Sequence, residues 1–97
     1  MHVGICRISL HLPENRSLKG KRQVVRSLCG RLRSRFDVSA AEVADQDLWQ
    51  SAVVGVVTVS GDARTAGEMI DRVIEFTEES FPDVRVVECD RDVLDLT

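Results

Sequence analysis

Basic residues are the most concentrated source of possible chemistry in this sequence. Residues 7–36 contain nine of the thirteen lysines and arginines but only one acid, Glu14, whereas the rest of the chain is acidic. If this segment is helical, at about 100° per residue, four of its cations fall within an arc of about 60°. The predicted row is Lys19, Arg22, Arg26 and Arg33, with Arg16 and Lys21 nearby.

Such a row favours contact with nucleic acid, because lysine and arginine supply a sequence-independent attraction to phosphates. We therefore predict a non-enzymatic accessory protein whose partner is structured RNA or a ribosomal particle. Two alternatives stay open for the same residues: an ordinary solvated helix face, and a contact with an acidic protein.

A second group of polar residues surrounds a predicted hairpin. Glu42, Gln46 and Asp47 form this possible polar cluster. The acids Glu42, Asp45 and Asp47 also offer, with His11, ligands for a hard metal or an acid/base pair. The spacing is nonspecific, and acids in turns are more often solvated or capping groups. We assign no catalytic residue, metal ligand or cofactor to the sequence.

The loop at residues 12–17 is the other place where an anion could bind. Arg16 and Asn15 could hold a phosphate in the manner of acylphosphatases. However, the loop has no glycine, and phosphate-cradling loops usually need glycines to bring several backbone amides to one anion. An anion- or metal-dependent hydrolase is therefore the weakest hypothesis, and the sequence leans against an enzyme without deciding the question.

The cysteines and the N-terminal residues bear on the cellular location. Cys6, Cys29 and Cys89 are odd in number, far apart and without a CxxC pair, which disfavours a disulfide framework or a structural zinc site. We expect three small buried side chains in a reducing compartment. The N-terminus lacks a secretory signal pattern and no apolar run reaches the ~18–20 residues of a membrane span, so we predict a cytoplasmic protein.

Six segments have the hydrophobic periodicity of strands or helices. In chain order they are a strand at 2–12, a helix at 18–35, strands at 38–43 and 51–60, a helix at 63–81 and a strand at 84–89, before a polar tail at 90–97. Ser17 stands where its side chain can cap the first helix, and the turn Ser60-Gly61-Asp62 can supply the cap of the second. Because 97 residues suffice for one hydrophobic core but not for two, we predict a single domain over residues 1–97.

This β-α-β-β-α-β order predicts an α+β, ferredoxin-like fold, a sandwich in which a four-stranded antiparallel sheet carries two helices on one face. The other face of the sheet is then open. Val3 and Ile5 would form an apolar patch there with half of the strand at 51–60, and such patches often mark interfaces. A homodimer through this open face is our second hypothesis, and a thinly covered sheet in a monomer is its alternative.

The aromatic residues limit how this fold could bind RNA. Single-strand readers of this kind stack bases on aromatic side chains of the two central strands. The predicted strands at 2–12 and 51–60 have none, so we predict contact with the RNA backbone or with its shape. Trp49 either anchors a partner or covers the end of the core, and we favour the core position.

Three short stretches resemble the YlxP-like family of small bacterial proteins, and the likeness covers nearly the whole length. They are Ser17-Leu18-Lys19-Gly20-Lys21-Arg22, Val38-Ser39-Ala40-Ala41-Glu42-Val43 and Gln46-Asp47-Leu48-Trp49-Gln50. The resemblance implies a ferredoxin-like fold, a cytoplasmic bacterial protein, and a gene that often lies among translation-initiation and ribosome-maturation genes. It implies no established activity. The positions to which it draws attention, without giving them a role, are Ser17, Lys19, Lys21, Arg22, Glu42, Gln46 and Asp47.

Gly20 departs from the family pattern, which usually has an acid three residues after the Ser17 cap. The reciprocal capping box is then lost. Glycine also lowers helix propensity by up to ~1 kcal/mol relative to alanine. We expect a looser first turn at this point.

Overall fold

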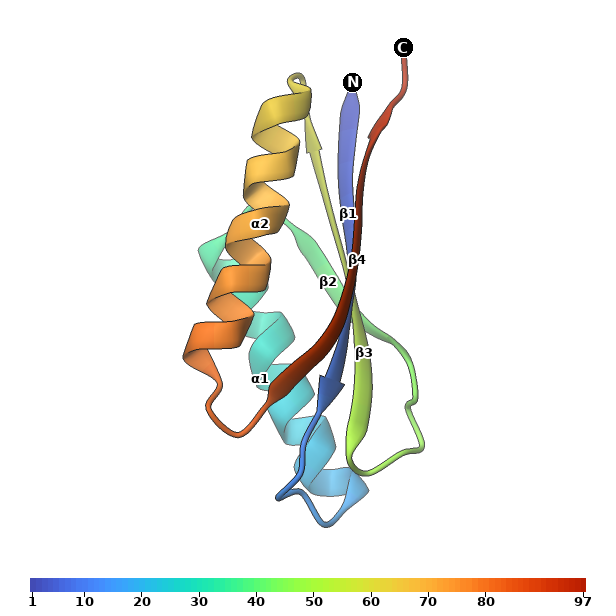
Figure 1. The fold of residues 1–97 in the computed structure, drawn as a ribbon, viewed down its shortest axis with the longest axis vertical. Helices are drawn as coiled ribbons and strands as arrows, with labels where there is room; N and C mark the ends of the chain where they lie inside the picture. The colour runs from blue at the N-terminus through green and yellow to red at the C-terminus, as the bar shows by residue number, and fades with distance from the viewer.

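Alternating apolar residues and two apolar helical stripes produce six elements, which are coloured along the chain in Figure 1. The computed structural model describes residues 1–97. Its elements are β1 (His2–His11), α1 (Leu18–Arg35), β2 (Ser39–Ala44), β3 (Ser51–Ser60), α2 (Ala63–Ser80) and β4 (Arg85–Asp95). The strands form one antiparallel sheet in the order β2-β3-β1-β4, and both helices cover the same face (Figure 1). The predicted α+β, ferredoxin-like fold is confirmed.

Both predicted helix caps are formed. The Ser17 hydroxyl accepts a hydrogen bond from the Gly20 amide at 3.0 Å, and the Asp62 carboxylate accepts one from the Thr65 amide at 3.1 Å. The Thr65 hydroxyl also donates to Asp62 at 2.7 Å, and these bonds hold the pKa of Asp62 below its ordinary value. Each cap satisfies an amide that the first helical turn leaves unpaired.

The core lies between the helices and one face of the sheet. Alternate residues of β1 point into it, as the sequence pattern predicts, and Ile8 is fully buried beside Leu28 of α1 and Val73 of α2 in the same apolar cluster. Cys6 and Cys29 are buried as expected. Cys89 is exposed, so the expectation of three buried cysteines is wrong for this residue.

The last strand is longer than the sequence pattern predicts. A polar tail was expected from residue 90, but β4 continues to Asp95 and pairs with the whole of β1. Two of its charged residues pair with neighbouring elements: Asp90 pairs with Arg7 of β1 at 2.8 Å, and Arg91 pairs with Asp71 of α2 at 2.9 Å. Because these side chains stay largely exposed at the sheet edge, the segment lacks the apolar alternation from which strands are predicted.

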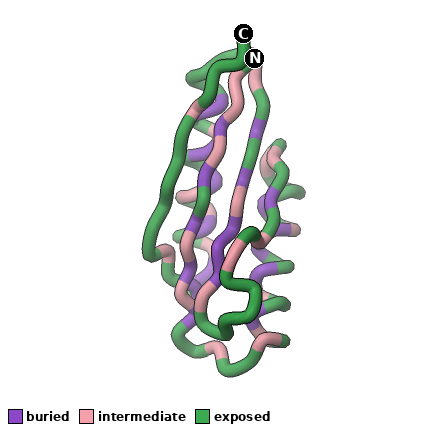
Figure 2. The backbone as a smooth tube through the Cα atoms, turned by 90° about the vertical axis from the view of Figure 1, so that its right-hand side faces the viewer, coloured by how far each residue is buried: buried purple, intermediate pink, exposed green.

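The face of the sheet opposite the helices has no covering element (Figures 1 and 2). Val3 lies between Val59 and Leu94 in the strand register, and Ile5 lies opposite Val57. Val59 is 63% exposed, and Val57 and Leu94 are also exposed. These five residues are called the open-face patch below, and their placement on one face agrees with the predicted apolar patch. Neither helix is long and apolar enough to cross a membrane.

Candidate functional site

The predicted basic row lies on the side of α1 that faces the edge strand β2. Lys19, Arg22, Arg26 and Arg33 are exposed, and Arg16 is exposed in the preceding loop. The three arginines of this row line a depression of about 260 Å³ between α1 and β2. The other lining residues are Val25, Cys29, Ala40, Ala41 and Glu42. The structure therefore brings the arginines of the row together over one concave surface.

Arg33 is fixed at the rim of this depression. Its Nη1 donates a hydrogen bond to the Ala40 carbonyl of β2 at 2.8 Å. A guanidinium has five N–H donors, so most of its donors are left for another acceptor. This contact also occupies a carbonyl group on the unpaired edge of β2.

The other two arginines of α1 belong to a different surface. The Arg31 guanidinium lies 4.9 Å from the ring centroid of Phe81, and that of Arg35 lies 5.1 Å from the ring centroid of Phe76. Such cation–π contacts place both side chains on the side of α1 nearest α2. They are not part of the basic row.

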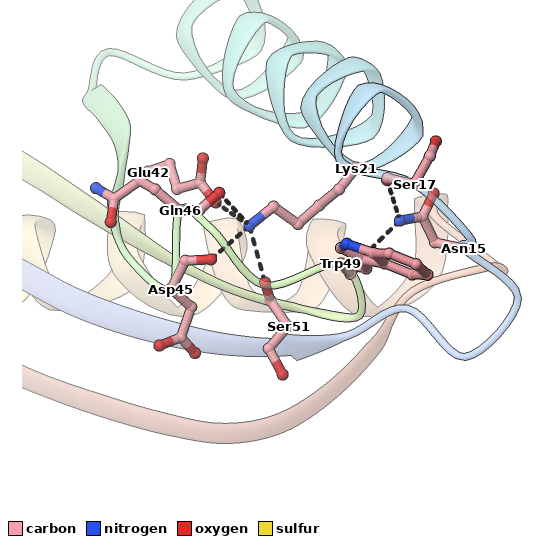
Figure 3. A network of polar contacts seen from close by, with 8 residues as sticks. All are labelled: Asn15, Ser17, Lys21, Glu42, Asp45, Gln46, Trp49 and Ser51. Atoms are coloured by element: carbon pink, nitrogen blue, oxygen red, sulfur yellow. Dashed lines mark hydrogen bonds and ion pairs between the residues drawn. The ribbon is translucent and has the colours of Figure 1, made fainter.

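Lys21 is buried, so it does not lie with the exposed cations where the sequence analysis placed it. Its side chain is 0% exposed, and its Nζ lies 3.0 Å from Glu42 Oε2. Nζ also donates hydrogen bonds to the backbone carbonyls of Asp45 at 2.5 Å, Ser51 at 3.1 Å and Gln46 at 3.2 Å (Figure 3). An ammonium group has three donors, and these carbonyls use all three, so Lys21 has none left for a phosphate.

A sequence signal for this burial existed. Lys21 stands four residues before Val25 and seven before Leu28, in register with the apolar stripe of α1. A lysine at a stripe position must either extend along the surface or find acceptors inside. Here the loop between β2 and β3 supplies those acceptors, and Glu42 Oε2, which is buried without a hydrogen bond of its own, is neutralised by the ammonium charge.

The predicted polar cluster does not converge into one site. Glu42 is the ion-pair partner of Lys21, Gln46 contributes its backbone carbonyl, and Asp47 is exposed. His11 Nδ1 lies 3.0 Å from the backbone carbonyl of Gln50. No group of three or more His, Cys, Asp or Glu side chains is close enough to hold a metal ion.

The loop at residues 12–17 is tied to the β2–β3 loop. Asn15 Nδ2 donates to the backbone carbonyls of Ser17 at 2.7 Å and Trp49 at 2.5 Å (Figure 3). Both amide donors of Asn15 are therefore used within the chain, which weakens the hypothesis that this residue holds an anion with Arg16. Gln50 Nε2 adds hydrogen bonds to the carbonyls of Pro13 and Asn15, at 3.0 and 3.2 Å.

Gly20 leaves room for this connection. A Cβ atom at position 20 would collide with Asn15 Oδ1, and it would lie 3.2 Å from the Ser17 hydroxyl. The absence of a side chain at this position thus lets Asn15 pack against the first turn of α1. The departure from the acidic family pattern has a local steric reason.

Residues 3–91 match the model of a family described as "Protein of unknown function (DUF503)". The chain belongs to this family. The "Uncharacterized protein YlxP" of Bacillus subtilis (strain 168) is 35% identical to it over 68 residues, which cover 70% of this chain and 73% of the relative. The resemblance to the YlxP-like family is therefore confirmed.

In this DUF503 chain the three stretches that carried the resemblance meet at one end of the molecule. Lys21 comes from the first stretch, Glu42 from the second and Trp49 from the third, and Figure 3 draws them within one polar network. Trp49 itself is 56% exposed, so the expectation that its ring covers the core is wrong. The network fixes the backbone of the β2–β3 loop and leaves the indole outside.

Proposed function

We propose that this protein is a non-enzymatic accessory factor that binds structured RNA or a ribosomal particle in the cytoplasm through α1. Lys19, Arg22, Arg26 and Arg33 contact phosphates, and Arg16 extends the contact into the preceding loop. The observation that carries the proposal is the depression between α1 and β2, which three arginines line. Aligned cations over a concave surface match a phosphate backbone in both charge and shape.

The ion pair between Lys21 and Glu42 supports this proposal. Glu42 is the single acid among the residues that line the depression, and its charge is balanced by Lys21 at 3.0 Å. The three arginines therefore keep their positive potential. Lys21 acts on binding indirectly, by cancelling a carboxylate charge that would otherwise weaken the attraction for phosphates.

The surface of the sheet favours backbone recognition over base stacking on strands. β1 and β3, the two central strands, contain no aromatic residue, and their uncovered face presents Val3, Ile5, Val57 and Val59. RNA recognition through A-form shape and phosphates needs no such aromatics. Contact through α1 and the loops at its first turn is consistent with this composition.

The test is a salt series of RNA-binding and ribosome-cosedimentation measurements on the purified chain and on Arg22→Glu/Arg26→Glu. Arg33 is left unchanged, because its bond to Ala40 also serves the fold. We expect at least a tenfold loss of affinity, and a slope of log K against log salt that is shallower by about one and a half to two, since two phosphate contacts are lost.

The matched control is Arg72→Glu/Arg85→Glu. Both arginines are exposed outside α1, and the change in net charge is the same. The control should retain most of the affinity. No RNA binding by the natural chain at low salt would contradict the proposal. Equal losses of affinity in both variants would also contradict it, because they would reflect net charge alone.

The open-face patch favours a second candidate function, a homodimer formed face to face through the sheet. Exposed apolar residues on one face often mark an interface, and here Val57, Val59 and Leu94 lie around Val3. Analytical ultracentrifugation tests this directly. We expect a concentration-dependent dimer that Val59→Glu abolishes and that Val87→Glu, at an exposed valine of the β4 bulge, preserves. A chain that stays monomeric at high concentration would exclude the dimer.

A further inference from the structure

Trp49 presents an unoccupied aromatic surface at the end of the basic row. It is 56% exposed, and its neighbour Leu48 is 52% exposed. All aromatic and cation–π contacts within the molecule involve Phe36, Phe76 and Phe81 instead. A tryptophan usually buries most of its large ring, so this exposure leaves an unusual amount of aromatic surface available to a partner.

The backbone that carries this indole is held on both sides. Lys21 binds the carbonyls of Asp45, Gln46 and Ser51, as described above, and Asn15 binds the carbonyl of Trp49 itself at 2.5 Å. The Leu12 amide donates to the Gln50 carbonyl at 2.9 Å. These hydrogen bonds hold the backbone on both sides of the indole before any partner binds. A surface that is organised in advance loses less conformational entropy when it binds.

The backbone of Trp49 is also tied to the segment that carries two cations of the proposed RNA site. Asn15, which holds the Trp49 carbonyl, directly precedes Arg16 and lies four residues before Lys19, and both cations are exposed. Figure 3 draws the indole next to Asn15 and Ser17, at the first turn of α1. An exposed aromatic plane together with neighbouring cations is the combination that binds unpaired bases: the ring stacks on a base while the cations contact phosphates.

We infer that Trp49 stacks on one unpaired nucleobase of an RNA whose backbone lies along α1. The inference rests on the proposed function and adds a preference to it: the protein selects RNA with a loop or bulge over an uninterrupted duplex. Stacking uses the π face that every base has, so the preference concerns an unpaired base rather than a particular sequence.

Trp49 fluorescence gives a direct readout, because the chain contains one tryptophan and no tyrosine. The probes are an RNA hairpin with an unpaired loop and a blunt duplex of the same length. We expect the hairpin to quench the emission and the duplex to bind more weakly without quenching. Trp49→Ala should lower hairpin affinity about tenfold and remove the preference over the duplex, whereas Trp49→Phe keeps part of it.

Leu48→Ala is the matched control, since Leu48 is an exposed apolar residue of the same loop. This variant should bind the hairpin as the natural chain does. Equal quenching by hairpin and duplex would overturn the inference. Salt-sensitive RNA binding with unchanged fluorescence and normal affinity in Trp49→Ala would overturn it too, while leaving the proposed function intact. If the natural chain bound neither RNA, both the inference and the proposed function would be wrong. A spectral shift with ribosomal proteins stripped of RNA, but not with RNA, would assign Trp49 to a protein contact instead.

Discussion

The two helices have the same length and cover the same face of the sheet, yet they carry opposite charges. α1 has seven basic residues and no acid, whereas α2 has five acids and two arginines. The exposed charges of α2 are partly paired, as in Arg64–Glu68 at 3.0 Å. The only ion pair of α1 is buried, between Lys21 and Glu42.

This difference teaches that the exposed charges of Lys19, Arg22 and Arg26 are not required by the fold, because none of these side chains makes an ion pair or a hydrogen bond within the chain. Packing needs an apolar stripe, and both helices have one. Arg22 and Arg26 are four residues apart in α1, a spacing at which like charges destabilise a helix by a few tenths of a kcal/mol. Unpaired like charges that cost stability are more readily explained by a ligand than by folding, and α1 is therefore the helix on which the proposed function rests.

The largest expected effect concerns the buried polar groups of the two helices. Lys21→Met should lower the free energy of unfolding by about 3–5 kcal/mol, because it leaves the Glu42 carboxylate and three carbonyls without their partner. Thr77→Val in α2 should cost about 1 kcal/mol or less, since it removes a single neutral hydrogen bond to Val73. Urea unfolding measures both. Adding Glu42→Gln to Lys21→Met should recover part of the lost stability. Equal decreases in the free energy of unfolding for Lys21→Met and Thr77→Val would contradict the central role of Lys21.

The next effect tests whether the position of the charges matters or only their sum. Arg22→Glu/Arg26→Glu combined with Glu75→Arg/Glu79→Arg keeps the natural net charge but moves the cations to α2. We expect RNA affinity to stay about tenfold below that of the natural chain, equivalent to about 1.4 kcal/mol, because the depression beside β2 has lost its arginines. Equilibrium binding at fixed salt measures this. Full recovery of affinity would show that overall charge, not α1, attracts the RNA.

A smaller effect separates the two helix caps by pH. Hydrogen bonds from Thr65 lower the pKa of Asp62 in the folded state. Its contribution to stability is therefore complete above the unfolded aspartate pKa of about 3.9, and is lost as the pH falls through the lower folded pKa. The Ser17 cap of α1 does not titrate. The amide chemical shift of Thr65 should move in acid while that of Gly20 does not, and Asp62→Asn should remove the titration. A shared midpoint for both amides would instead indicate global unfolding.

The smallest effect concerns the thiols near each helix. Burial raises the pKa of Cys29, although Arg33 of α1 opposes the shift. Burial also raises the pKa of Cys89, and Glu78 of α2 adds to it. Cys89 is the exposed thiol, so alkylation of the folded protein should modify it alone, slowly at neutral pH. Mass spectrometry of the labelled peptides measures this, with Cys89→Ser as the control. Labelling of Cys29 before unfolding would mean that α1 opens from the sheet.

The regular elements could be predicted from the sequence because their signals are local. α1 begins and ends at residues 18 and 35, and β3 at 51 and 60, as the apolar spacing predicts. β4 was predicted too short because its second half is stabilised by pairing with β1 and by ion pairs. Those interactions join residues far apart in the chain, and they leave no periodic pattern in the sequence.

The candidate site was predictable in its exposed part and not in its buried part. Helical spacing placed Lys19, Arg22 and Arg26 on one side of α1, and they are exposed there. Position in the chain also put Lys21 near them, but it did not reveal that three carbonyls of the β2–β3 loop surround its ammonium group. The same network leaves Trp49 exposed, although its residue type favours the core.

By itself, the sequence determined the order of the elements, the face that each one buries and the separation of positive from negative charge, because periodicity and composition are properties of neighbouring residues. Only the tertiary structure decided which cations are available to a ligand. A lysine in an apolar stripe is buried if distant acceptors satisfy its three donors, and the fold brings Asp45, Gln46 and Ser51 to Lys21. Those contacts fix the loop that presents Trp49 beside the first turn of α1.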